Sequence, residues 1–541
     1  MGLITPICKL AVAAALSCSS SLVSAKTEDT VDLFAAARLA EIGNRDGDAL
    51  KGYIKLYKKA PDSSVLADRI FDTAIRSGDM VAALRAVRAQ ELRGEVSSEA
   101  PLLLFADAFT RENWPMAKLA ADELLVRGNF GFMTPILQSW VNVAQGKAAD
   151  LPEAGANADP VFAFYSTDQR IYLQLATGEF AKAKLGLRAM AAVGDNYARD
   201  LMLRAAPVIL AQGDHMFADA LVRSAIDADR QAWPVANKRN GKLSAEEGLS
   251  ALHVRIAGAL LEQNLKDQAL VPARIAVWYS PDDEPAKLML ANALAAQSLN
   301  QQASASAKTI MPTSLYWPQA VKQRVANLAP AEATILAQKA ARDWPKSVDL
   351  ALLAAQTEEL TGDLPSALAR YRSIVDIAAT GGLSPRQRAH YHLLLASALD
   401  KSGNWNDARV QLDAALVLDP NNAQILNYLG YSLLERNEDV ERASAMVRKA
   451  FEFAPGSTAI MDSMGWSHFQ TGEFTQAVTF LEKAAKASGN DLAINEHLGD
   501  AYWRSGRMRD ARYAWRVASQ TAEGEVASRL AGKIDIGLPN L

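Results

Sequence analysis

Histidine and carboxylate side chains are the residues of this 541-residue chain that could carry acid–base or metal chemistry. The six histidines include no pair with four-residue spacing and an intervening glutamate, the arrangement that zinc hydrolases use on one helix face. His390 and His392 are two residues apart and therefore point to different faces of a helix. Carboxylates are plentiful, but the sequence does not show which of them converge in space. The pattern predicts no catalytic residue, no metal site and no cofactor.

Phosphate-binding loops and activated serines are a second kind of chemical signature. The sequence has neither a GxxxxGK[ST] nor a GxGxxG loop, and it has no GxSxG elbow. The stretch from Thr380 to Gly382 is better explained as a flexible connection between helices, because Pro385 follows it. We therefore predict that the protein is not an enzyme. An enzyme accessory with weak hydrolytic chemistry of its own stays open as an alternative.

The charge balance bears on nucleic-acid binding. The chain has 57 Lys and Arg against 61 Asp and Glu, a formal net charge of −4. A phosphate-binding surface normally carries a basic excess or a basic stripe. Arg509, Arg512 and Arg516 share one helical face by their spacing, but a solvated face near a helix C-terminus explains them. We predict no nucleic-acid partner.

Recognition of another protein is the chemistry that the C-terminal region favours. Aromatic side chains there stand beside carboxylates or carboxamides, at comparable places in three successive segments. An aromatic ring offers a large contact area at low entropic cost, and the polar neighbours can pair with a bound backbone or a basic side chain. The predicted binding residues are Asn427, Tyr431, Asp462, Trp466, Phe469, Glu496, Asp500, Trp503 and Arg504. The alternative for Trp466 and Trp503 is packing between repeats.

An internal repeat predicts the elements that position these residues. Small residues recur at two places in each unit, with a spacing of 34 or 35 residues. They are Gly430, Gly465 and Gly499 at one place, and Ala408, Ala443, Ala477 and Ala511 at the other. A unit of roughly 34 residues with small residues at fixed places forms a helix-turn-helix hairpin, which buries its apolar face by stacking on the next hairpin.

From Arg388 to Ala522 the sequence resembles the tetratricopeptide repeat (TPR) family. The family's Leu-Gly, turn-glycine and alanine places are filled in register, as by Gly465, Gly472 and Ala477, while Asn437 replaces one turn glycine. Upstream, the same helix-glycine-helix pattern recurs with irregular spacing. We predict an all-α, TPR-type helix-turn-helix solenoid, a right-handed α-α superhelix, with degenerate repeats in the N-terminal half.

The predicted organisation has five parts. They are a signal peptide (1–25), a degenerate helical-repeat region (26–345), a helical hairpin with a connection (346–387), regular TPR repeats (388–526) and a C-terminal tail (527–541). In a TPR superhelix the first helix of every hairpin lines the concave groove. The resemblance therefore implies that the predicted binding residues line a groove.

The first residues predict export. Lys9 precedes the apolar run Leu10 to Leu16, and Val23 to Ala25 offers small residues for cleavage, which is typical of a signal peptide. That run is too short to span a membrane, and no later segment predicts a transmembrane helix. Both cysteines, Cys8 and Cys18, fall in this leader. We expect a periplasmic protein; the alternative is an outer-membrane lipoprotein that faces the periplasm and is anchored at Cys18.

A narrower resemblance concerns the partner. The runs Leu426–Leu433, Ile460–Trp466 and Glu496–Trp503 are similar to C-terminal repeats of envelope TPR proteins of Gram-negative bacteria. Among these are adaptors of carboxyl-terminal processing proteases, so the resemblance implies a scaffold that presents substrates to such a protease. Asp462 and Glu496 would repel a C-terminal carboxylate, so a neutral or basic protein ligand is expected. The alternative is a structural subunit of an envelope assembly or export complex for polysaccharide, pili or outer-membrane proteins.

Overall fold

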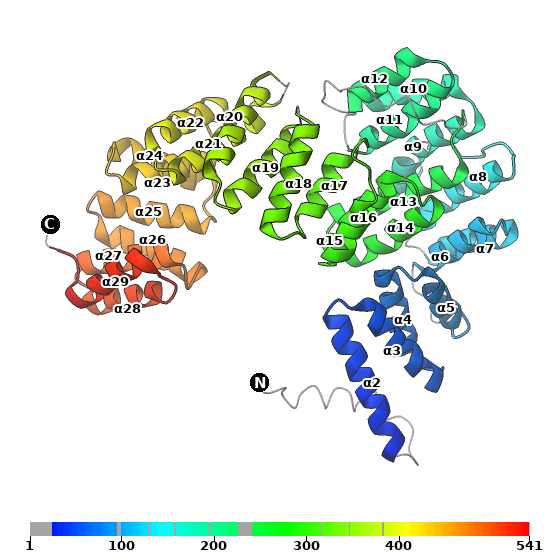
Figure 1. Ribbon diagram of the computed structural model, residues 1–541, viewed down its shortest axis with the longest axis horizontal. Coiled ribbons are helices and arrows are strands. Elements are labelled where there is room, and N and C mark those ends of the chain that lie inside the picture. The colour runs from blue at the N-terminus through cyan, green and yellow to red at the C-terminus, as the bar shows by residue number, and fades with distance from the viewer. Residues whose placement is uncertain are drawn as a thin grey trace. The chain divides into compact units, whose positions relative to one another are not determined.

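The computed structural model describes residues 24–94, 99–127, 130–155, 158–193, 196–225, 241–314, 316–345, 347–380 and 383–539. Within these ranges the regular secondary structure is helical, without a strand (Figure 1). The chain divides into two compact units, Met1–Ala340 and Ala341–Leu541. The predicted all-α architecture of stacked helix-turn-helix hairpins is confirmed. Residues 1–23, which hold Cys8 and Cys18 of the predicted leader, lie outside the described residues.

The first unit is a succession of helical hairpins whose last helix, α18, crosses the division between the units. Its helices are α2 (Ser24–Ile42), α3 (Asp46–Lys59), α4 (Ser64–Ser77), α5 (Met80–Glu91), α6 (Ala100–Thr110), α7 (Trp114–Arg127), the 3-10 helix η1 (Gly131–Met133), α8 (Thr134–Ala144), α9 (Pro160–Thr177), α10 (Phe180–Ala191), α11 (Asn196–Ala211), α12 (His215–Ala225), α13 (Ala245–Glu262), α14 (Lys266–Tyr279), α15 (Glu284–Ala296), α16 (Asn300–Lys308), α17 (Trp317–Val325) and α18 (Pro330–Asp343).

The second unit continues with hairpins of more regular length. Its helices are α19 (Val348–Leu360), α20 (Leu364–Thr380), α21 (Pro385–Lys401), α22 (Trp405–Leu418), α23 (Ala423–Glu435), α24 (Val440–Phe453), α25 (Thr458–Gln470), α26 (Phe474–Ala487), α27 (Leu492–Arg504), α28 (Met508–Ser519) and α29 (Gly524–Ile536). The turns inside its hairpins need a left-handed backbone, which Gly472 supplies with φ +80° and Asn437 with φ +53°.

The repeated glycines of the second unit lie where the two helices of a hairpin cross. A Cβ atom on Gly465 would stand 2.4 Å from Leu481 Cγ, and one on Gly499 would stand 2.3 Å from Trp515 Cδ1. Leu481 and Trp515 are fully buried, so neither has free space to move into. The regular spacing of these glycines therefore reflects the close approach of the two helices in each hairpin, as the small-residue pattern predicted.

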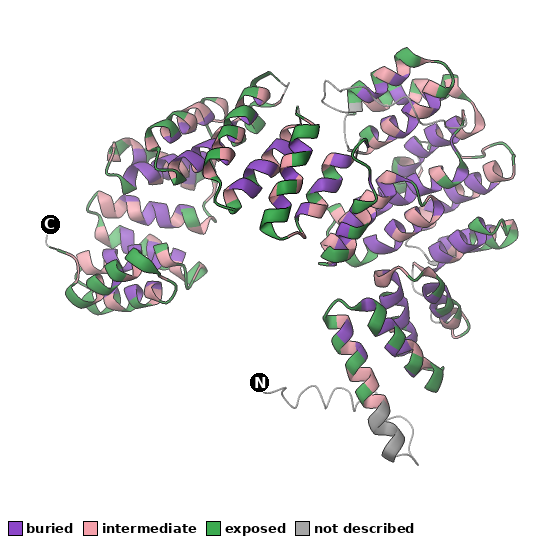
Figure 2. Cartoon of the chain, viewed as in Figure 1, coloured by how far each residue is buried: buried purple, intermediate pink, exposed green. Residues whose placement is uncertain are grey.

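The first unit folds back on itself. Helix α13 packs against α8 and α9, and α14 packs against α4 and α6; all four partners end more than sixty residues before α13 begins (Figure 1). Twelve of the 18 residues of α13 are buried (Figure 2). Gly248 of α13 makes this packing close, because a Cβ atom there would stand 2.1 Å from the ring of the fully buried Trp140. Helices α4 and α6, each the first helix of its hairpin, are thus contacted by α14 of the same chain.

Polar contacts close the same interface. Arg274 of α14 donates hydrogen bonds to the carbonyl oxygens of Ile75 (2.9 Å) and Arg76 (2.7 Å) at the C-terminal end of α4. These carbonyls have no partner within their own helix, so the guanidinium caps the helix end and favours its dipole. The irregular period of the N-terminal repeats did not reveal this long-range closure.

Candidate functional site

The predicted binding residues come from the first helices of three successive hairpins, α23, α25 and α27, which contact one another in that order. We call their shared surface the first-helix face. It is defined by Asn427, Tyr431, Glu435, Asp462, Trp466, Phe469 and His497. It lies within the second unit.

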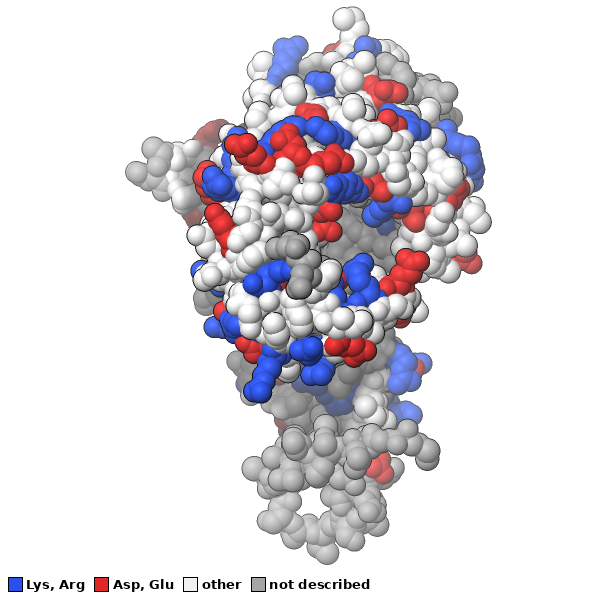
Figure 3. All heavy atoms as spheres, turned by 90° about the vertical axis from the view of Figure 1, so that its left-hand side faces the viewer, with Lys and Arg blue, Asp and Glu red and all other residues white. Residues whose placement is uncertain are grey.

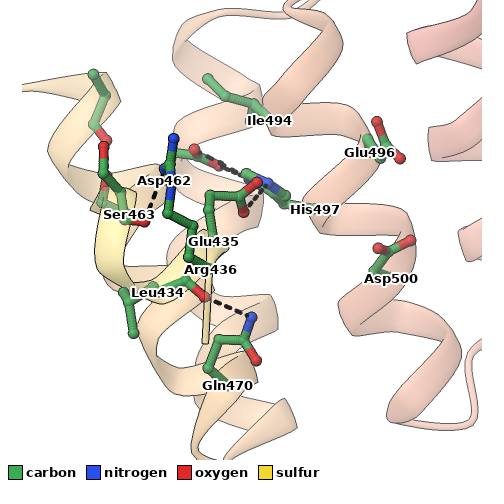
Figure 4. A network of polar contacts seen from close by, with 12 residues as sticks. Leu434, Glu435, Arg436, Asp462, Ser463, Gln470, Ile494, Glu496, His497 and Asp500 are labelled. Carbon is green, nitrogen blue, oxygen red and sulfur yellow. Dashed lines mark hydrogen bonds and ion pairs between the residues drawn. The ribbon is translucent and has the colours of Figure 1, made fainter. Parts of the chain in front are cut away.

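His497 is the centre of the first-helix face (Figure 4). Its Nδ1 atom lies 3.0 Å from Asp462 Oδ1, and its Nε2 atom lies 3.8 Å from Glu435 Oε1. His497 is only 7% exposed and Asp462 is equally buried, whereas Glu435 reaches solvent. The histidine therefore joins carboxylates from the two preceding first helices.

Aromatic rings surround the same histidine. The Trp466 ring stacks on His497 with centroids 4.2 Å apart and planes 22° apart, and on Phe469 with centroids 4.7 Å apart. The Tyr431 ring lies 6.0 Å from His497. Trp466, Phe469 and Tyr431 are all half-buried. Trp466 consequently packs across the repeats and still leaves part of its ring open to a ligand.

Charge and burial shift the pKa values of His497 and Tyr431. Burial alone would lower the pKa of His497, but Asp462, Glu435 and Asp500 raise it above its ordinary value. Burial and the neighbouring carboxylates Glu435 and Asp462 raise the pKa of Tyr431, so its hydroxyl stays protonated. His497 is therefore held in its charged form to a higher pH than a free histidine.

Two polar atoms beside this cluster lack a hydrogen-bond partner within the described part of the chain. They are Asn427 Oδ1, an acceptor, and Trp466 Nε1, a donor, and both atoms are shielded from solvent. A buried polar atom without a partner costs free energy, so such atoms are uncommon in folded proteins.

The last repeat differs from the expected open groove. Glu496 accepts hydrogen bonds from Arg529 Nε (2.9 Å) and Nη2 (2.8 Å), and Lys533 Nζ lies 2.7 Å from Glu496 and 2.7 Å from Asp500. Glu496 and Asp500 are 7% and 5% exposed. These carboxylates are buried because α29 packs over them and contributes both cations. Most of α29 lies in the segment predicted as a C-terminal tail (527–541).

Trp503 and Arg504 lie at the end of α27. The Trp503 ring lies 5.6 Å from the fully buried Trp515 ring and 5.1 Å from the Arg512 guanidinium, and Gly537 packs directly on it. Trp503 thus packs beneath the C-terminal segment, away from the His497 cluster. Arg504 is half-buried in the last turn of α27.

Several residues that make the central contacts of the site are not among those predicted from the sequence. The predicted binding residues do not include His497, Glu435, Arg529 or Lys533. One signal was present, because Asp462 and His497 are 35 residues apart and so stand one repeat apart with complementary charge. The cations of α29 had no such signal, since they lie beyond the last repeat.

Possible metal ligands and the length of apolar helices are two further features of the described ranges. Within them no three His, Cys, Asp or Glu side chains are grouped as a metal site would need. None of the helices described is both long and apolar enough to cross a membrane. On the face drawn in Figure 3, acidic and basic side chains are interspersed, so neither sign dominates there.

Comparison with known proteins identifies the repeats. Residues 393–458 and 463–520 match the tetratricopeptide repeat family. The TPR repeat-containing protein PA4667 of Pseudomonas aeruginosa is 36% identical over 95 residues, which cover 17% of this chain and 16% of that protein. This chain thus matches about a sixth of the length of its curated relative. The predicted TPR repeats are confirmed, and TPR repeats form extended surfaces that bind other proteins.

Solved structures of low sequence identity also resemble the chain. The crystal structure of the APC/C hetero-tetramer Cut9-Hcn1 matches with 14% identity and a TM-score of 0.41, covering 94% of this chain and 96% of that one. Yeast Tom70 matches with 13% identity and a TM-score of 0.30, covering 95% and 96%. Pseudomonas aeruginosa PilF matches with 20% identity and a TM-score of 0.28, covering 34% and 82%.

Proposed function

We propose that the protein is a non-enzymatic scaffold whose first-helix face binds a neutral or basic segment of a partner protein. The observation that carries this proposal is the His497 cluster. It combines half-buried aromatic rings with the exposed carboxylate of Glu435. Rings of this kind supply contact area, and the Glu435 carboxylate can pair with a basic side chain of the bound segment.

The first unit supports the same assignment by contrast. Its helices α4 and α6 are contacted by α14, so the chain itself occupies part of the surface that their hairpins would offer to a ligand. The second unit has no such inserted hairpin over α23, α25 and α27 among its described residues. Binding is therefore proposed for the second unit.

In this proposal the protein works in the bacterial cell envelope. The leader-like residues before Lys26 support export to the periplasm, and Cys18 offers an acylation site for the lipoprotein alternative. The partner is a carboxyl-terminal processing protease or a protein presented to it. The second candidate, a structural subunit of an envelope assembly or export complex, rests on the same binding face and differs in the partner bound.

Reversing a charge on the first-helix face tests whether the partner binds there. Glu435→Lys places a cation where a basic segment would lie, and Glu452→Lys makes the same charge change at an exposed position of α24, the second helix of that hairpin. Affinity capture of each tagged chain from native envelope extract, followed by mass spectrometry, measures the bound partner. We expect Glu435→Lys to lose the partner that the wild type and Glu452→Lys retain.

Each outcome has a defined meaning. Equal capture by both variants contradicts binding at the first-helix face. A stoichiometric processing protease favours the adaptor role, whereas recovery of a polysaccharide, pilus or outer-membrane complex favours the structural subunit. Acyl labelling that disappears in Cys18→Ser establishes the lipoprotein alternative, and a mature N-terminus at Lys26 contradicts it.

A further inference from the structure

The terminal side of α27 carries a buried pair of carboxylates that α29 neutralises. Glu496 and Asp500 are one helical turn apart, and so are Arg529 and Lys533. Lys533 Nζ reaches both carboxylates at 2.7 Å, while Arg529 holds Glu496 with two hydrogen bonds. The two helices thus match each other in both charge and spacing.

The carboxylates need a cation as long as they are buried. Their side chains are only 9% and 8% exposed. Burial raises the pKa of Asp500 despite the ion pair with Lys533. Burial would also raise the pKa of Glu496, but Arg529 and Lys533 lower it below its ordinary value. Removing the partner of a buried charge is strongly unfavourable. Any helix that replaces α29 must therefore bring cations to the same places.

α29 itself is lightly attached. Leu530 is its one buried residue among 13, and the Arg529 side chain is 56% exposed. No side-chain hydrogen bond caps its N-terminus, where Gly524 has φ +57°. Its apolar attachment is the contact of Leu530 with Ala511, Trp515 and Ala518, together with the partly buried side chains of Val526 and Ile534. A helix with so little buried surface opens more readily than the hairpin on which it packs.

The position of α29 also repeats a contact made inside the solenoid. Asp462 of α25 pairs with His497 of α27, one repeat further on, and Glu496 of α27 pairs in the same direction with Arg529 of α29. Figure 4 shows Glu496 and Asp500 on the side of α27 that faces away from Asp462. α29 therefore stands where the first helix of a following repeat would stack.

We propose that α29 is a displaceable internal occupant of this terminal surface, and that a basic amphipathic helix of a partner protein takes its place. The partner helix carries two cationic side chains one turn apart with an apolar residue beside them, as Arg529, Leu530 and Lys533 do. This surface is distinct from the first-helix face, and the inference does not depend on what binds there.

A peptide of residues 523–537 is the probe, because it has the chemistry that the surface accepts. Its binding is measured by fluorescence anisotropy to the full chain, to Arg529→Gln/Lys533→Gln and to the control Arg509→Gln/Arg516→Gln. The control removes the same charge from exposed positions of α28. The tethered helix competes at high effective concentration, so we expect the first double variant to bind the peptide about 100-fold more tightly than the wild type and the control. Adding Glu496→Gln/Asp500→Asn should abolish this binding.

Equal affinities for the wild type and the α29 variant overturn the proposal, and so does absence of binding to the folded variant. Hydrogen exchange of the unmodified chain provides a measurement that does not depend on a variant folding. We expect the amides of α29 to exchange at least about tenfold faster than those of α27 and α28, and exchange of all three helices in one step contradicts a displaceable helix. If the peptide does not bind while Glu435→Lys still abolishes partner capture, the inference about α29 is contradicted and the proposed function is not.

Discussion

A single histidine links three repeats of the second unit. His497 meets Asp462 and Trp466 of α25 and lies beside Glu435 of α23. In the sequence, the spacing of one repeat between His497 and Asp462 is the one signal of this link. Its importance comes from the carboxylates that surround it, because a buried charge is stable only when it is paired.

The stability of the second unit should depend on the protonation of His497. Its pKa in the folded protein is raised above the ordinary value, despite burial, by Asp462, Glu435 and Asp500. The charged pair therefore contributes fully below the unfolded pKa of about 6.5, and its contribution is lost as the pH rises through the folded value. Urea unfolding followed from about pH 5.5 to about pH 9 should show this loss. A His497→Gln chain should lack the step, and an unchanged step there would assign it to another group.

The crossing glycines allow a second test with single residues. Gly499→Ala pushes a methyl group against Trp515, which is fully buried and held by a hydrogen bond from Nε1 to Asp500. We expect a loss of about 1–3 kcal/mol in the free energy of unfolding, measured by urea denaturation. Gly532→Ala has no atom within 4 Å of the new Cβ and should gain up to about 1 kcal/mol, because alanine favours a helix. A neutral Gly499→Ala would contradict this helix register.

At the scale of elements, α13 is the helix that fixes the first unit. It packs on α8 and α9 while α14 reaches α4 and α6, so one hairpin holds helices that the chain placed much earlier. Its burial on nearly all sides sets it apart from a helix of an open stack, which keeps one polar face.

A methyl group on α13 should loosen this closure. Gly248→Ala places its Cβ atom against Trp140, and the ring is held by a hydrogen bond from its Nε1 to Gln169. We expect faster hydrogen exchange in α4, α6 and α14, together with a lower melting temperature of the first unit. Gly47→Ala in α3 meets no neighbour and serves as the matched control. Unchanged exchange in Gly248→Ala would show that α13 is not tightly docked.

At the scale of the whole molecule, the chain consists of two compact units. The second unit has its own hydrophobic clusters, from Ala351 onward, and its own predicted binding residues. Repeats of this kind depend mainly on their nearest neighbours for stability. The units should therefore tolerate separation.

A chain of residues 347–541 should fold alone and keep partner capture. Circular dichroism should report the helical content expected from α19 to α29, and capture from envelope extract should match that of the full chain. Unfolding of this fragment, or capture only by the full chain, would show that the first unit takes part in folding or binding.

The sequence by itself determined the helices, the hairpin turns and the order of the regular repeats. These features depend on local spacing, since Gly465, Gly472 and Ala477 specify a crossing, a turn and a packing position within a few helical turns. The predicted boundaries between the parts of the chain, the export signal and the binding role of the predicted residues stay predictions.

Only the tertiary structure decided which surfaces are covered. It placed α14 on α4, set His497 between Asp462 and Glu435, and laid Arg529 against Glu496. Such contacts join residues that are tens to hundreds of positions apart. They depend on the small rotation between successive hairpins, which accumulates along the stack and has no local signature in the sequence.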